Sequence, residues 1–166
     1  MKRAAPSYDW NFSLKDAQAR YEKVQKGWED MLLLAYMVHN KADPERWPDV
    51  YSHYFNEKDQ TKVETVFHDL VGATEDVPGG NPAPDGGAEL LKNIIISNKR
   101  VTGDLCNDPK YIAFLAYPED ETKFILRLCE PAWEFPLFSD RKCEDVGDRT
   151  SGKMSLLGGV ILHEMM

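Results

Sequence analysis

The sequence predicts an α+β fold in which helices come first, a small sheet follows, and a last helix carries the candidate site. Apolar residues recur every three or four positions over the first seventy residues, which is typical of amphipathic helices. Short β-branched and aromatic runs bounded by turn residues follow between positions 93 and 128, as expected for strands. Helices and strands that are segregated along a chain favour an α+β layout.

The first predicted helix begins after Ser13, whose hydroxyl is expected to cap it, and closes before Asp43 and Pro44. Its stretch from Met31 to Val38 is apolar nearly all round, so this end is predicted to be deeply buried. The apolar stripe consists of Leu14, Ala17, Tyr21, Val24, Trp28, Met31, Ala35 and Val38.

Two further helices and a loop are predicted before the sheet. The aromatic segment from Trp47 to Phe55 is expected to be helical from Pro48. The segment from Asp59 to Val71 carries one apolar face, and Gly72 follows where a C-terminal cap is expected. The segment from Val77 to Gly87 is rich in proline and glycine, which predicts a loop.

Three strands are predicted over 93–97, 111–117 and 123–128. In the last strand, apolar residues of one face alternate with residues of a more solvated face. A short helix over 131–138 and a buried helix over 155–166 complete the chain. We assign residues 1–12 to an N-terminal extension and residues 13–166 to a single domain.

Charge and hydropathy exclude several classes of partner. The net charge of −8 and the scattered basic residues argue against nucleic acid and against an anionic membrane surface. The longest apolar run, Met31 to Val38, is too short to span a bilayer. No apolar segment follows the first residues, so no secretory signal peptide is visible.

The segment from Val160 to Met166 matches the start of an H-E-x-x-H zinc helix. Positions i and i+4 share one helix face, so two imidazoles can chelate one ion while the glutamate reaches a metal-bound water. His163 and Glu164 would supply the first ligand and the general base, and the second histidine would directly follow Met166. The alternative is an ordinary helix that ends in a solvated His-Glu pair. The remaining histidines (His39, His53 and His68) show no ligand spacing.

Cys106, Cys129 and Cys143 allow either reduced thiols or one bridge with one cysteine left over. No C-x-x-C pair is present, so a cysteine zinc site is not expected. Asn11 begins an Asn-Phe-Ser acceptor for N-glycosylation, which has meaning only in a secreted chain.

Several segments taken in order resemble the fungal lysine-specific metallo-endopeptidases and the deuterolysin-like peptidases, the aspzincins. The resemblance spans most of the chain and is weakest over the first forty residues. The matching segments are 54–56, Asp59, 63–72, Cys106, 116–117, 125–129, 132–133, 137–143, 147–149 and 156–164.

This resemblance implies a zincin-like fold whose C-terminal helix carries the active site. His163 would bind zinc and Glu164 would be the catalytic base, so that the complete domain hydrolyses peptide bonds of protein or peptide substrates. The family's second histidine and its third ligand, an aspartate in a Gly-Thr-x-Asp segment, have no positions here. We therefore expect a domain incomplete at its C-terminus that binds zinc weakly and is inactive, because catalytic zinc uses three protein ligands.

The resemblance also implies a disulfide between Cys106 and Cys129, an unpaired Cys143, and secretion to the extracellular space. Two other functions stay open, a non-catalytic secreted binding protein on a zincin-like scaffold and a small intracellular helical module. Without the rest of the family's domain, the helix from Leu156 to Met166 is expected to be exposed and to favour self-association through its apolar face.

Overall fold

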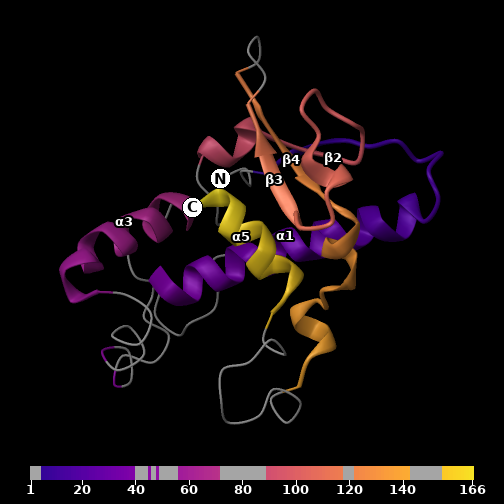
Figure 1. Ribbon diagram of the computed structural model, residues 1–166. Helices are drawn as coiled ribbons and strands as arrows, with labels where there is room; N and C mark the ends of the chain where they lie inside the picture. Colours follow the sequence, from indigo (N-terminus) through magenta and orange to yellow (C-terminus); the bar gives the residue numbers. More distant parts are fainter. Residues whose placement is uncertain are drawn as a thin grey trace.

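A computed structural model describes residues 5–39, 45, 48, 56–71, 89–117, 122–142 and 155–166. Within these ranges the chain forms three α-helices and one four-stranded mixed sheet, which confirms the predicted α+β class. Figure 1 shows the strands grouped on one side of the molecule, with α1 and α5 crossing beneath them and α3 beside the end of α5.

The sheet has the order β1-β2-β4-β3. Strand β2 (Ile94–Ser97) runs parallel to β1 (Ser7–Asp9) on one side and parallel to β4 (Phe124–Leu128) on the other. Strand β3 (Ala113–Ala116) pairs antiparallel with β4 and is an end strand of this sheet. Its position at one end leaves β3 with a single strand neighbour among the described residues.

Strand β1 lies inside the segment that the sequence assigned to an N-terminal extension. Three residues are too few to show alternation, so the pattern gave no signal for it. The segment is nevertheless part of the folded body. The backbone N–H of Asn11 donates to Oδ1 of Asn98 at 2.7 Å, and Nδ2 of Asn98 donates to the carbonyl of Asn11 at 3.1 Å.

Helix α1 (Ala17–His39) begins later than predicted. Asp16 has a φ of 57°, which no helical residue adopts, and Leu14 is 48 % exposed rather than on the buried stripe. Ser13 is therefore not the cap. Further along, most of the predicted stripe is buried, namely Ala17, Val24, Trp28, Met31 and Ala35. Its last third is less buried than predicted, because Leu32, Leu33, Leu34 and Val38 are half-buried and Met37 is exposed.

Helix α3 (Gln60–Val71) follows a 3₁₀ turn at Glu57–Asp59 and buries Phe67, Leu70 and Val71. It agrees closely with the predicted 59–71 helix. The predicted helix over 47–55 (except Pro48), the cap at residue 72 and the loop over 77–87 lie outside the described residues. The predicted short helix over 131–138 is instead two 3₁₀ turns, Glu130–Glu134 and Phe138–Asp140.

Helix α5 (Leu157–Met165) packs against α1 at a crossing lined by two glycines. A Cβ on Gly27 would lie 2.9 Å from the side chain of Leu157, and a Cβ on Gly158 would lie 2.6 Å from Cβ of Asp30. The start of the helix is held by the N–H of Leu157, which donates to the carbonyl of Pro136 at 2.9 Å. These contacts hold the candidate site helix against the core.

The core fills the space between the sheet and the helices, and its largest fully buried side chains include Met31, Ile96, Leu126, Leu157 and Ile161. Among the described residues, no helix combines the length and the apolar character that crossing a membrane requires.

Candidate functional site

His163 and Glu164 lie in the last turn of α5, where His163 is exposed and Glu164 is half-buried. Both line a groove of about 740 Å³ between this helix and the segment that leads into β3. The two residues singled out by the sequence therefore face one concave surface, and neither is enclosed in the core.

The other side of the groove is the segment from Lys110 to Phe114, which leads into β3, an end strand of the sheet. The N–H of Cys129 donates to the carbonyl of Ile112 at 2.8 Å, which marks a hydrogen-bonded pair in the register of β3 and β4. Such pairs alternate in antiparallel sheets, so the backbone groups of Ala113 and Leu115 point away from β4. Ala113 lines the groove and is 6 % exposed.

Apolar side chains make up most of the groove wall, and Tyr111 and Ile112 are 41 % and 37 % exposed there. Lys110 is the basic residue of the wall and Glu164 is its carboxylate. The apolar lining consists of Leu34, Tyr111, Ile112, Ala113, Phe114, Phe135, Leu156 and Val160. A concave apolar surface beside a strand that has one strand neighbour among the described residues suits an extended peptide.

The described residues do not fit a catalytic zinc ion. No group of three His, Cys, Asp or Glu side chains within them is arranged to hold a metal, whereas such a site needs three protein ligands and a water. His68 lies on α3 beside Asp69, with 3.4 Å between its Nδ1 and the carboxylate. His53 and the side chain of His39 lie outside the described part. His163 is thus the one imidazole on the groove wall as described.

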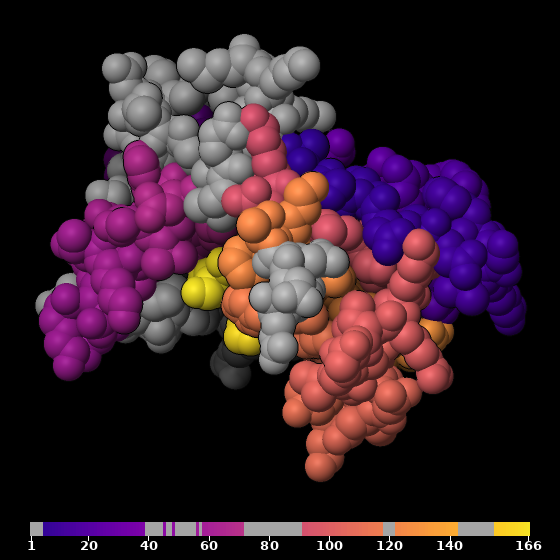
Figure 2. Space-filling model, turned by 90° about the horizontal axis from the view of Figure 1, so that it is seen from above, coloured from indigo at the N-terminus to yellow at the C-terminus, as the bar shows by residue number. Residues whose placement is uncertain are grey.

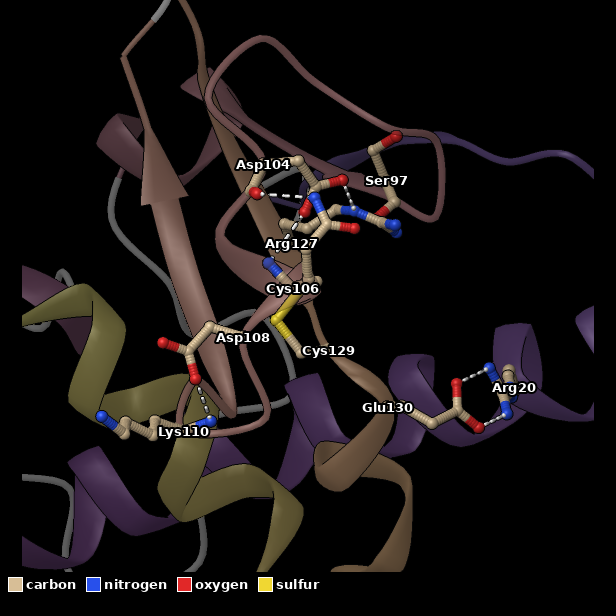
Figure 3. The surroundings of a disulfide bond; sticks show 10 residues. Arg20, Ser97, Asp104, Cys106, Asp108, Lys110, Arg127, Cys129 and Glu130 are labelled. Atoms are coloured by element: carbon tan, nitrogen blue, oxygen red, sulfur yellow. Dashed lines mark hydrogen bonds and ion pairs between the residues drawn. A yellow bond between two sulfur atoms is a disulfide. The ribbon is translucent and has the colours of Figure 1, made fainter.

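Cys106 and Cys129, the pair that the resemblance implied, are joined in a disulfide. The bond ties the 3₁₀ turn at Leu105–Asn107 to the end of β4, and Cys129 is 1 % exposed. Oδ1 of Asp104 accepts the N–H of Cys106 at 2.9 Å, and Oδ2 of Asp104 lies 3.5 Å from Nε of Arg127 (Figure 3). Cys143, predicted to be unpaired, lies outside the described residues.

The glycosylation candidate Asn11 lies in a turn at the surface. Its Oδ1 accepts the N–H of Ser13 at 3.0 Å, and Asn11 itself is half-buried while Ser13 is exposed. Phe12 between them is 55 % exposed. The acceptor segment thus faces solvent, and its modification stays a prediction.

The apolar face of α5 is less exposed than the self-association prediction assumed. Leu157 and Ile161 are fully buried, and Leu162 is 9 % exposed. Figure 2 shows the helix, in yellow, only as small patches between α3 and the strands. Val160, Met165 and Met166 are the apolar side chains that it leaves partly or fully exposed. Self-association through them stays a prediction.

A second cavity of about 250 Å³ was not foreseen from the sequence. It lies beside the disulfide, shares no residue with the groove, and is lined by charged side chains from α1, the 98–107 segment and the end of β4. Its basic residues are far apart along the chain, so no cluster was visible in the sequence.

No family model, no curated protein and no solved structure matches this chain. The resemblance to the aspzincin peptidases consequently remains a prediction from the residues. The zincin-like fold that it implies also remains a prediction.

Proposed function

We propose that this chain belongs to a zinc metalloendopeptidase-like domain that holds a peptide substrate in the groove between β3 and α5. The observation that carries the proposal is that His163, Glu164 and the first residues of β3 line one concave surface. Metallopeptidase chemistry needs an extended substrate beside a metal-bound water and a general base. The groove supports that arrangement because it brings together the residues for both parts.

The peptide is held as an additional strand. Backbone N–H and C=O groups of Ala113 and Leu115 point outward, so an extended chain can pair with them while its side chains enter the apolar wall. Lys110 lies on the β3 side of the groove and the carboxylate of Glu164 lies on the α5 side. An acidic side chain of the peptide is therefore expected to bind near Lys110. Peptides are thus expected to be bound largely by their backbone and by apolar side chains.

In the complete domain, zinc bound at His163 would supply a Lewis acid and an activated water. We assign Glu164 the role of the base that holds a proton during this chemistry. The resemblance assigns only one of the family's zinc ligands, His163, to this sequence, so we predict that these 166 residues bind zinc weakly and do not hydrolyse peptides.

A second function, peptide binding without hydrolysis in a secreted protein, is favoured by the same missing ligand group among the described residues. Both functions place the protein in the extracellular space. The disulfide supports this placement, because such bonds persist in oxidising compartments.

Peptide binding is tested by fluorescence polarisation with a labelled heptapeptide of apolar residues and one glutamate. Two analogues carry backbone N-methyl groups at odd or at even positions. Because a strand pairs through alternate residues, one analogue should lose about tenfold or more in affinity while the other binds normally. Equal binding by both analogues, or no binding of the parent peptide, would refute strand addition.

Mass spectrometry of the same peptide with equimolar zinc separates the two functions. Cleavage that disappears in Glu164→Gln would show a working peptidase and overturn the predicted inactivity. Binding without cleavage, with weak zinc retention on dialysis, is the result that we expect.

A further inference from the structure

We propose that the cavity beside the disulfide is a binding site for a small oxyanion, a carboxylate, phosphate or sulfate group. This site is independent of the peptide groove. Its volume of about 250 Å³ equals roughly eight water molecules, which suits a small anion better than a peptide.

The first argument is charge. Four basic side chains line the cavity, Lys15, Arg20, Arg100 and Arg127, against two carboxylates, Asp104 and Glu130. The chain as a whole has a net charge of −8, whereas the cavity lining has two more positive than negative groups. The charge of the cavity is therefore opposite in sign to that of the chain. A concave wall of one sign raises the local concentration of the opposite ion.

The second argument concerns which of these cations are already neutralised. Arg20 donates to Glu130 through both of its Nη atoms, with Nη1 2.9 Å from Oε2 (Figure 3). Its guanidinium also lies 5.2 Å from the ring of Trp133. The pKa of Glu130 lies below its ordinary value, chiefly because Arg20 donates to it, and the charge of Lys15 contributes. Arg100 is exposed and forms no ion pair within the described residues. It remains available to a ligand.

The third argument is the state of Arg127, whose side chain is 13 % exposed. It lies 3.5 Å from Asp104 and donates to the carbonyl of Ser97 at 3.5 Å, both at the outer limit for such contacts. The buried Nε is the atom that faces Asp104, and within the described part of the chain this ion-pair contact falls short of a hydrogen bond. A buried donor without a partner is costly, and the planar guanidinium fork matches carboxylate and phosphate oxygens. An oxyanion in the cavity would be bound by the outer nitrogens of Arg127, whose contact with Ser97 is weak, together with Arg100.

The test is a set of NMR titrations of the full chain with sodium phosphate, sulfate, acetate or chloride at constant ionic strength. We expect saturable shifts in the amides of 98–107 and 127–130 with at least one of the three oxyanions and not with chloride. Which of them binds identifies the ligand chemistry. Shifts that are the same with chloride, or that lie elsewhere, would overturn the proposal.

Two variants and one control locate the site. Arg100→Gln should weaken binding about tenfold, because it removes a charge-assisted donor from an exposed position without disturbing the core. Arg127→Lys keeps the charge but loses the fork, so it should also weaken binding. Lys99→Gln removes the neighbouring cation, which pairs with Asp9 and does not line the cavity, and should leave the affinity unchanged. Unchanged binding in both arginine variants would overturn the site.

Discussion

At the scale of single residues, Gly158 decides how closely α5 can approach α1. A Cβ at this position would lie 2.6 Å from Cβ of Asp30 and 2.8 Å from the backbone nitrogen of Met31, and backbone atoms cannot rotate away. We expect Gly158→Ala to lower the free energy of unfolding by about 1–3 kcal/mol, as overpacked cores do, despite the better helix propensity of alanine. Urea denaturation followed by circular dichroism measures this change.

The adjacent Gly159 is the matched control. It lies in the same helix, but a Cβ there would meet nothing within 4 Å. Gly159→Ala should therefore raise the free energy of unfolding by up to about 1 kcal/mol through helix propensity alone. If both variants changed stability in the same direction, the close crossing of α1 and α5 would not be the cause.

Asp30 beside this crossing gives a pH-dependent prediction. Burial raises the pKa of Asp30, as do the nearby charges of Glu29 and Asp140, although its carboxylate accepts the N–H of Phe138 at 2.8 Å. A carboxyl whose folded pKa is raised stabilises the fold most below its unfolded value of 3.8, and this contribution is lost as the pH rises through the folded pKa. At pH 7 the ionised group therefore opposes folding.

Asp30→Asn keeps an acceptor for the N–H of Phe138 and removes the charge. We expect a higher melting temperature than that of the wild type at pH 7, and a difference that shrinks as the pH falls toward 3. Glu22→Gln, at an exposed position of the same helix, changes the net charge equally and should show no such trend. A gain for Asp30→Asn that persists undiminished at pH 3 would contradict the explanation.

At the scale of elements, the sequence predicted helices with amphipathic patterns well, but it did not predict where the first helix begins. The spacing of apolar residues in α3 and α5 predicted both helices within two residues of their ends. The start of α1 was missed, because Asp16 adopts a positive φ and Ser13 bonds to Asn11 instead of capping the helix. Local propensity could not show this, since the turn is held by contacts with Asn98, distant in the sequence.

The position of His163 on α5 gives a prediction about helix geometry. One histidine added after Met166 would stand four positions after His163 and on the same helix face. We expect this extended chain to bind Co²⁺ or Zn²⁺ at least about tenfold more tightly than a chain extended by one alanine, because two imidazoles then share one ion. The absorption spectrum of bound Co²⁺ reports the site. Equal affinities would show that α5 does not continue as a helix beyond its present end.

At the scale of the whole molecule, the disulfide joins the 3₁₀ turn at Leu105–Asn107 to the end of β4. The cysteines are 23 residues apart, so the loop-entropy estimate gives about 3 kcal/mol of stabilisation. We expect Cys106→Ser combined with Cys129→Ser to lower the free energy of unfolding by about this amount. Urea unfolding of the wild type with and without reductant provides the comparison, and the double variant should not respond to reductant.

A thiol count in the unfolded, unreduced chain completes this test. One free thiol is expected, because the chain has three cysteines and Cys143 is predicted to be unpaired. Three free thiols in freshly purified protein would argue against both the bridge and secretion.

The sequence could predict only those parts of the candidate site whose residues are adjacent in the chain. His163 and Glu164 were visible as a dipeptide on an apolar helix, and the structure places both on one groove. The groove itself was not visible, because Lys110 and the edge of β3 reach it from another part of the chain. Neither was the polar cavity, whose Arg20 and Arg127 come from α1 and β4. Sequence patterns report local periodicity, whereas such surfaces arise from long-range packing.

The pairing of β1 with β2 determines the order in which this protein can fold during synthesis. Ser7 is opposite Ile95 in the sheet, so the first strand has no neighbour until nearly a hundred residues have been made. The crossing of Gly27 with Leu157 on α5 comes later still. Contacts so distant in sequence slow folding and leave apolar surfaces exposed in the growing chain. The nascent chain is therefore expected to depend on chaperones at least until α5 emerges from the ribosome.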